Sequence, residues 1–310
     1  MARKVLFDVD PGCDDAVMLA MALGLEEIDV VGISTVCGNS TTDNTTHNAL
    51  SILALGGYDV PVARGVDRPL EDELTTAEWV HGEGGIRGEM PAPTTSPIDV
   101  HGADFIVEQA RELGEALTIA AVGPLPNLAI ALAKEPALPD LVDDIYLMGG
   151  AATTVGNATP MAEANFHNDP VAASRVIQDA RPVHVGLDVT NRATIPLSAI
   201  ERYQAADGAL GVVGDWLRYP DEVLDFGEGG AAIHDAAVVA DIAGDVLTTE
   251  PYYCEVDTTG GPSHGATVCD VHGVLDRAPN TDVAVDIDVE AYRDLLTEGV
   301  EAYAAHADAA

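Results

Sequence analysis

Residues 7–16 read Phe7-Asp8-Val9-Asp10-Pro11-Gly12-Cys13-Asp14-Asp15-Ala16, and this stretch decides the fold. Residues 4–7 begin a buried strand, which Pro11-Gly12 ends, and the apolar run 16–23 predicts a buried helix. The stretch is therefore a loop at the carboxyl end of a strand. Open α/β sheets bind their ligands at such strand ends.

The loop carries Asp10, Asp14 and Asp15 close together. Like charges at this spacing raise one another's pKa unless a cation neutralises them. An Asp at a helix start often only caps the helix, which explains one of the three but not all of them. We therefore predict a site for a hard divalent cation with oxygen ligands.

Strands and helices alternate along most of the remaining chain. Further strands are predicted at 30–36, 60–63, 117–122, 144–148 and 183–187, and helices at 42–56, 103–113, 125–133 and 170–179. Extended segments follow at 252–256, 266–270 and 283–287, the first two joined as a hairpin through Gly260-Gly261-Pro262. This pattern predicts an α/β fold with a mostly parallel central sheet and helices on both faces, an open Rossmann-like core with additional C-terminal strands.

Two long segments, 64–102 and 207–233, lack clear periodicity. Loops of this length in a compact domain are usually lids or binding loops. No repeat or linker interrupts the chain, so we expect residues 1–310 to form a single domain.

The composition is strongly acidic, with 52 Asp and Glu against 14 Lys and Arg and a net charge of −38. This charge argues against nucleic acid or an anionic membrane as a partner. Lys4 and Lys134 are the only lysines. Acidic proteins also occur for solubility alone, but the scarcity of lysine favours a halophilic source with a salt-rich cytoplasm.

The four cysteines form no C-x-x-C pair, so their spacing indicates neither a zinc site nor a redox motif. The N-terminus runs straight into a strand without a signal peptide, and no apolar run is long enough to span a bilayer. We expect a cytoplasmic protein with reduced thiols.

Polar groups recur where the predicted strands stop. They are Asn39, the Val122 carbonyl at an irregular turn, the polar loop 156–170, and His234-Asp235 at the start of an apolar helix. Parallel strands bring such groups to one edge of the sheet. An amide-rich and carboxylate-rich pocket around a hard cation suits a polyhydroxyl ligand such as a sugar.

The segment 8–16 resembles the D-T-D-P-G-x-D-D-A hallmark of the inosine–uridine preferring nucleoside hydrolases. Further segments match that family in order: Cys37-Gly38-Asn39, Val80-His81-Gly82, 121–127, 156–165, His234-Asp235 and 264–270. Val9, Ala164 and Val171 depart from the family pattern. The region after Asp207 matches poorly, and nucleobase contacts are expected there.

The resemblance implies calcium-dependent hydrolysis of the N-glycosidic bond of ribonucleosides, giving ribose and free base for purine or pyrimidine salvage. Ca²⁺ would be bound by Asp10, Asp15, Asp235 and the Val122 carbonyl, and Asp10 would act as general base on a calcium-bound water. A homodimer or homotetramer is also implied.

The same resemblance assigns residues to the nucleoside. Asp14, Asn39, Asn157, Glu163 and Asn165 would hydrogen-bond the ribose hydroxyls. His234 would protonate the leaving base, with packing beside a helix start as its alternative. His81 would lie near the 5′-hydroxyl or the base, or be solvated.

Three aromatic residues are also candidates for the site, and two of them have a second interpretation. Phe166 would wall the base pocket or join the core. Trp216 and Tyr219 would stack on the base, or Trp216 would belong to the core.

Two rival functions remain open at this point. A haloacid-dehalogenase-type phosphohydrolase using Mg²⁺ also begins with a strand ending in D-x-D, but Lys134 lacks the paired-acid context of that family. A non-catalytic nucleoside-binding protein is the other, and the retained Asp10, Asp15 and His234-Asp235 argue against it.

Overall fold

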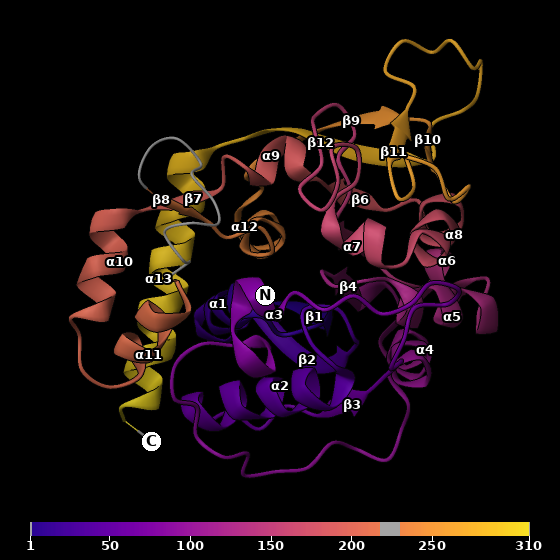
Figure 1. The fold of residues 1–310 in the computed structure, drawn as a ribbon. Helices are drawn as coiled ribbons and strands as arrows, with labels where there is room; N and C mark the ends of the chain where they lie inside the picture. The colour runs from indigo at the N-terminus through magenta and orange to yellow at the C-terminus, as the bar shows by residue number, and fades with distance from the viewer. Residues whose placement is uncertain (1, 218–229, 310) are drawn as a thin grey trace.

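The computed structural model describes residues 2–217 and 230–309. An eight-stranded sheet forms its centre (Figure 1). Its strands are β1 (Arg3–Val9), β2 (Ile28–Thr35), β3 (Val62–Arg64), β4 (Leu117–Ala121), β5 (Asp144–Met148), β6 (Val183–Val185), β9 (Leu247–Tyr252) and β12 (Thr281–Ile287). Two antiparallel pairs lie outside it: β7 (Thr194–Pro196) with β8 (Gly230–Ala232), and β10 (Cys254–Val256) with β11 (Thr267–Cys269).

The strand order in the sheet is β3-β2-β1-β4-β5-β6-β12-β9. All of its pairings are parallel except that between β12 and β9. The first six strands have the order of a doubly wound sheet, which reverses between β1 and β4. The predicted fold class is therefore confirmed, and the loops after β1 and β4 meet at the reversal point.

Helices cover both faces of the sheet. Residues of α1 (Cys13–Gly24), α2 (Thr42–Gly56), α12 (Ala236–Gly244) and α13 (Val289–Ala307) bury their apolar side chains in one core cluster, together with Val5, Phe7 and Val9 of β1. Residues of α4 (Gly102–Leu113), α5 (Pro126–Lys134) and α8 (Pro170–Ala180) form the other cluster, with Leu6 of β1. Alternate residues of β1 thus face opposite layers, as the period of a strand requires.

The remaining helices are short. They are α3 (Glu78–His81), α6 (Leu138–Leu141), α7 (Ala164–Asn168), α9 (Leu187–Thr190), α10 (Leu197–Gln204), α11 (Ala209–Trp216), and the 3₁₀ turns Glu83–Gly85 and Gly114–Ala116.

The structure corrects the sequence analysis at three places. The segment 207–233 was expected to be irregular, but α11 forms within it because Val213 and Trp216 pack into the core. The strand predicted to Leu187 ends at Val185, and Leu187 begins α9. Helix α13 was not predicted. Tyr219, a candidate base contact, lies outside the described residues.

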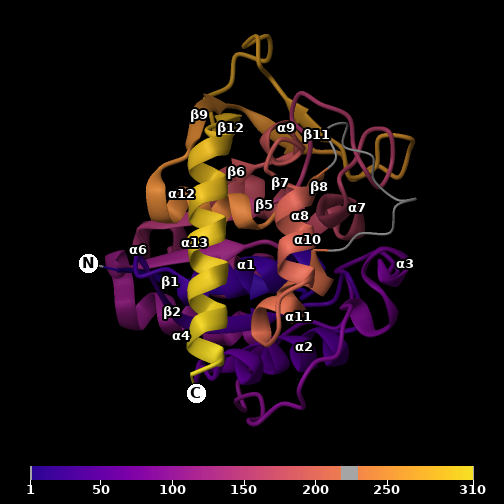
Figure 2. The same ribbon diagram turned by 90° about the vertical axis from the view of Figure 1, so that its left-hand side faces the viewer.

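Helix α13 runs along the molecule and packs on α1 (Figure 2). The two backbones approach closely at Gly24 and Gly299, where a Cβ built on Gly299 would lie 2.6 Å from the Met21 carbonyl oxygen. Only glycine leaves room for this contact.

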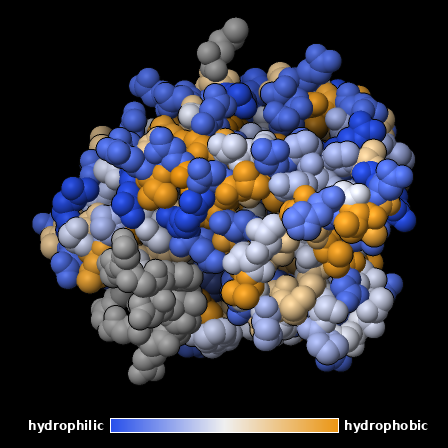
Figure 3. All heavy atoms as spheres, turned by 90° about the horizontal axis from the view of Figure 1, so that it is seen from above, coloured by the Kyte–Doolittle hydropathy of each residue, from blue (hydrophilic) through white to orange (hydrophobic). Residues whose placement is uncertain are grey.

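The face seen in Figure 3 is mostly hydrophilic, with smaller hydrophobic groups between the polar side chains. Within 2–217 and 230–309, no helix has both the length and the apolar character needed to cross a bilayer.

Candidate active site

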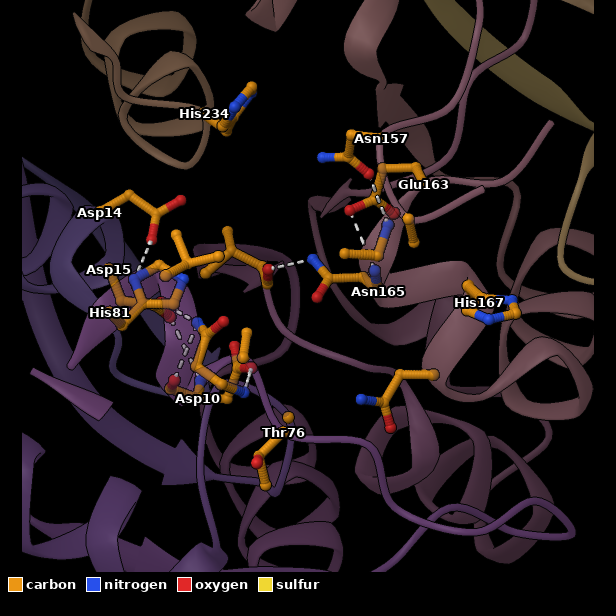
Figure 4. A pocket seen from close by; sticks show the side chains of 18 of the residues that line it. Asp10, Asp14, Asp15, Thr76, His81, Asn157, Glu163, Asn165, His167 and His234 are labelled. Carbon is orange, nitrogen blue, oxygen red and sulfur yellow. Dashed lines mark hydrogen bonds and ion pairs between the residues drawn. The ribbon is translucent and has the colours of Figure 1, made fainter. Parts of the chain in front are cut away.

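A cavity of about 310 Å³ lies at the carboxyl ends of the central strands (Figure 4). Its volume is in the range of small-molecule sites. Phe166 and Trp216 do not line it, whereas eleven of the predicted site residues do: Asp10, Asp14, Asp15, Asn39, His81, Val122, Asn157, Glu163, Asn165, His234 and Asp235. The strand ends therefore converge as the parallel sheet predicted.

The loop after β1 is ordered by its own carboxylates. Asp15 accepts hydrogen bonds from the backbone N–H of Gly12 (3.0 Å) and of Asp10 (3.2 Å). Asp15 therefore does cap α1, the alternative considered for a single Asp, and it also lines the cavity. One carboxylate thus fixes the loop and contributes to the site.

Asp10 is held from the neighbouring strand end. The backbone N–H of Asn39 donates to Asp10 Oδ2 (2.7 Å), and Asn39 Nδ2 donates to the Asp10 carbonyl and to Asp15 Oδ2. A side chain at Gly38 would clash with this carboxylate, and a Cβ at Gly123 would lie 2.6 Å from Asp10 Oδ1. These two glycines let the backbones after β2 and β4 approach Asp10.

Asp10, Asp14, Asp15 and Asp235 form what we term the acidic floor. Burial raises the pKa of Asp15 to about 7 and the pKa values of Asp10 and Asp235 well above the usual range, and repulsion from neighbouring carboxylates adds to each shift. Bringing these groups together as anions is unfavourable without a counter-charge. Perturbed carboxylates in a cavity are typical of functional sites.

The acidic floor fits a metal ion. One carboxylate oxygen each of Asp14, Asp15 and Asp235 lies within 4.8 Å of the others, and the buried Asp14 Oδ1 has no hydrogen-bond partner among the described residues. An all-oxygen donor set suits a hard cation. The cluster therefore contains Asp14 and not Asp10. From the sequence we expected the reverse, with Asp10 as a metal ligand and Asp14 as a ribose contact.

The Val122 carbonyl was expected to be available as a ligand. In the structure it accepts a hydrogen bond from Asn165 Nδ2 (2.7 Å) while still lining the cavity. A carbonyl oxygen has two lone pairs, so one acceptor position remains.

The opposite wall comes from the loop between β5 and α8, seen across from the acidic floor in Figure 4. Glu163 caps α7 and accepts from the backbone N–H of Asn165, Phe166 and Gly150. Burial raises its pKa to about 7. Asn157 Oδ1 accepts from the Ala164 N–H (3.0 Å). Both side chains are thus positioned by backbone contacts before any ligand binds.

Two histidines flank the floor. The Cys13 N–H donates to His81 Nδ1 (3.1 Å), so the neutral His81 ring carries its proton on Nε2. His234 Nδ1 is hydrogen-bonded to Thr190 Oγ1 (2.8 Å). Burial lowers the pKa of both rings, and the Asp14 charge opposes the shift in both.

Phe166 corrects the sequence analysis. It was expected among the substrate-binding residues, but it is fully buried and stacks on His184 with ring centroids 5.5 Å apart. In a helix, consecutive residues point in different directions, so Asn165 faces the cavity and Phe166 faces the core. Trp216 is also buried, which agrees with its core alternative.

Two segments of the chain form the mouth of the cavity. We define the cavity mouth as Thr75, Thr76, Ala77 and Trp79 of the segment 64–102, together with Asn157 and Ala158 of the loop after β5. The segment 64–102 is anchored by the Ala77 N–H on the Asn39 carbonyl and by Asn168 Nδ2 on the Thr75 carbonyl. The sequence predicted a binding loop here but not these residues, because an irregular loop gives no periodic signal. Trp79 is 73% exposed.

Comparison with known proteins identifies similar chains. The model of the inosine-uridine preferring nucleoside hydrolase family matches residues 5–294. The pyrimidine-specific ribonucleoside hydrolase RihB of Escherichia coli is 36% identical over 307 residues, covering 97% of this chain and 98% of that protein. A purine-preferring ribonucleoside hydrolase from Gardnerella vaginalis superposes with a TM-score of 0.87 at 30% identity, covering 99% of this chain and 100% of that one. A plant nucleoside hydrolase gives the same TM-score and identity over 97% and 99% of the two chains.

Proposed function

Because the chain belongs to the family of inosine-uridine preferring nucleoside hydrolases, it hydrolyses the N-glycosidic bond of ribonucleosides, and we propose that it does so around Ca²⁺ bound at the acidic floor. The observation that carries the proposal is the convergence of four largely buried carboxylates on one cavity. Enzymes of this family depend on a metal, and the cluster of Asp14, Asp15 and Asp235 can hold one.

Asp10, Asp15, Asp235 and the Val122 carbonyl would hold the ion, with Asp14 beside them. Calcium accepts six to eight oxygens in irregular geometry, which suits a mixed set of carboxylates and a carbonyl. When bound, such an ion supplies positive charge that lowers the pKa of a nearby water and orients the ribose hydroxyls.

Asp10 would take the proton of the attacking water while the water oxygen bonds to C1′. The Asn39 N–H holds this carboxylate in position through its hydrogen bond to Oδ2 (2.7 Å). As the C1′–N bond breaks, the ribose becomes oxocarbenium-like, and the surrounding carboxylates and amide oxygens stabilise the positive charge.

His234 would donate a proton to the departing base. Its lowered pKa makes the protonated ring a better donor, and the Asp14 anion favours the proton's arrival. Asp14, Asn39, Asn157, Glu163 and Asn165 would hold the ribose, and His81 would contact its 5′ side or the base. Buried sugar hydroxyls require such partners.

Neither rival interpretation fits a family match over 5–294. A haloacid-dehalogenase-type phosphohydrolase shares only the short D-x-D element, and the retained Asp10, Asp15 and His234-Asp235 argue against a non-catalytic binding protein.

The decisive assay measures free ribose from inosine, adenosine, uridine and cytidine at molar KCl. Both base classes are needed, since the relatives include a pyrimidine-specific and a purine-preferring enzyme. We expect EGTA to abolish release, and Ca²⁺ to restore it better than Mg²⁺ or Mn²⁺. Full activity in chelated, metal-free protein would contradict the calcium proposal and leave the hydrolase assignment standing.

Two properties accompany this proposal. The charge of −38 and the scarcity of lysine support adaptation to high salt, because added ions screen the repulsion among carboxylates. We expect the thermal midpoint to rise with KCl from 0.1 M to about 2 M; an unchanged midpoint would contradict adaptation.

We also propose that residues 1–310 form one domain that assembles as a homodimer or homotetramer. Both core clusters are built on the same sheet, which supports the single domain. Light scattering on the protein in molar KCl would measure the assembly, and a monomer at working concentration would contradict it.

A further inference from the structure

Cys254 and Cys269 face each other across the antiparallel pair β10–β11, and neither lines the cavity. Their separation in sequence, with no C-x-x-C spacing, concealed this pairing. All four cysteines of the chain are present as thiols. Cys254 is fully buried, whereas Cys269 is partly exposed.

The register places the two cysteines where strands come closest. Backbone hydrogen bonds join Asp270 N–H to the Tyr253 carbonyl (2.9 Å) and Asp257 N–H to the Ala266 carbonyl (3.0 Å). Hydrogen-bonded and non-hydrogen-bonded pairs alternate along an antiparallel ladder, so Cys254–Cys269 is a non-hydrogen-bonded pair. In pairs of this kind the Cα atoms generally lie about 4.5 Å apart. Disulfides span Cα distances of roughly 4.4–6.8 Å.

The two thiols also differ in chemistry. The Cys254 thiol hydrogen-bonds the Cys269 sulfur, which lowers the pKa of Cys269 and raises that of Cys254. Cys13 and Cys37 lack this arrangement, and burial raises the pKa of each to about 12. The thiolate is the nucleophile in disulfide exchange, so the more exposed Cys269 is suited to attack and Cys254 to resolve.

We propose that Cys254 and Cys269 are a redox-active dithiol that closes a cross-strand disulfide on meeting a low-molecular-weight disulfide. The Cys269 thiolate attacks the small disulfide and releases one thiol, leaving a mixed disulfide on Cys269. Cys254 loses its proton, attacks Cys269 Sγ and releases the second thiol. Two protein thiols are oxidised and one small disulfide is reduced to two thiols.

The bond would tie together strands that support the cavity wall. Thr267 of β11 accepts a hydrogen bond from the Ala151 N–H (3.3 Å), and the adjacent Gly150 N–H donates to Glu163 (2.8 Å). The disulfide would therefore join β10 covalently to β11, the strand that supports the wall carrying Glu163. It would not contact the acidic floor.

The test treats the folded protein with cystamine, a small disulfide whose two ammonium groups suit a chain of net charge −38. We expect the thiol count to fall from four to two and the mass to fall by two hydrogen atoms. Cleavage before aspartates separates the cysteines onto peptides 245–256 and 257–269, which should remain joined until reduced. The oxidised protein should melt about 2–5 °C higher.

Single variants separate the two roles. Cys254→Ser should keep a stable cystamine adduct on Cys269, and Cys269→Ser should gain neither adduct nor disulfide. A disulfide between another pair, a persistent adduct in the unaltered protein, or four intact thiols in folded protein would each overturn the proposal. The peptide map of the unaltered protein decides the matter if a variant fails to fold.

Discussion

The acidic floor and the mouth of the cavity are built by different means. The floor lies on the loop after β1, in the first turn of α1 and directly before α12, and its carboxylates are mostly buried. Two of them, Asp10 and Asp15, accept hydrogen bonds from backbone N–H groups. The mouth lies on the long segment 64–102 and on the loop after β5, and Trp79 and Asn157 are exposed.

This difference separates chemistry from recognition. Groups fixed by a rigid sheet hold the precise geometry that proton transfer needs, whereas loops vary without disturbing the core. We therefore expect floor substitutions to lower kcat and mouth substitutions to raise KM or change base preference. Four experiments test that division.

The largest effect is expected for Asp10→Ala. Loss of the proposed general base and metal ligand should lower kcat for ribose release by about 10³-fold or more. Asp99→Ala, an exposed acid away from the cavity, serves as the matched control. If a folded Asp10→Ala protein kept a near-normal turnover, the proposed catalytic role of the acidic floor would be wrong.

His234→Ala should lower kcat by about 10²-fold with natural nucleosides, because the base then leaves without a proton. With 4-nitrophenyl riboside, whose leaving group needs no proton, the loss should be much smaller. Asp10→Ala should be slow with both substrates. If His234→Ala lowered kcat equally with the two substrates, His234 would have a structural role and would not be the proton donor.

Trp79→Ala should raise KM about 3–10-fold and leave kcat nearly unchanged, since stacking of a base on an aromatic ring contributes about 1–3 kcal/mol when fully formed. Trp79→Phe should recover most of the affinity. Calcium affinity should not change in either variant. A collapse of kcat instead would erase the distinction between mouth and floor.

The smallest effect concerns stability and pH. Asp15 and Glu163 have folded-state pKa values of about 7 against ordinary values of 3.8 and 4.5, so the folded protein binds more protons between these limits. Their contribution to stability is complete below about pH 4 and is lost as pH rises through 7. The melting temperature of chelated protein should therefore fall between about pH 5 and pH 8, and saturating Ca²⁺ should reduce the fall.

Glu163→Gln should flatten this slope in chelated protein, and Asp99→Asn should not. A melting temperature that rises with pH in chelated protein would show that the folded protein binds fewer protons than the unfolded chain, which would contradict the raised pKa values.

The floor could be predicted because it follows from local sequence. A strand, a Pro-Gly break and an apolar helix place Asp10, Asp14 and Asp15 at a strand end, and His234-Asp235 precede another apolar helix. Parallel topology then brings the two together. The sequence also offered helix capping as the role of one of these aspartates, without saying which, and the structure gives that role to Asp15.

Features that depend on tertiary contacts could not be predicted in this way. Phe166 adjoins a cavity residue in sequence, yet the turn of α7 directs it to His184. Trp79 lies in a loop without periodicity, and the pairing of Cys254 with Cys269 depends on strand register. Helix α13 was overlooked although its Leu296, Val300 and Tyr303 are buried at helical spacing.

The packing of α13 on α1 has a consequence for synthesis. Helix α1, whose first turn carries Asp14 and Asp15, is synthesised long before the helix that covers it, which spans residues 289–307. At about 5–20 residues per second, that face of α1 lacks its partner while residues 25–288 are translated. The helix that carries Asp14 and Asp15 therefore waits for support from a distant segment, and a chain cut before residue 289 would contain every proposed site residue but leave the active site unsupported.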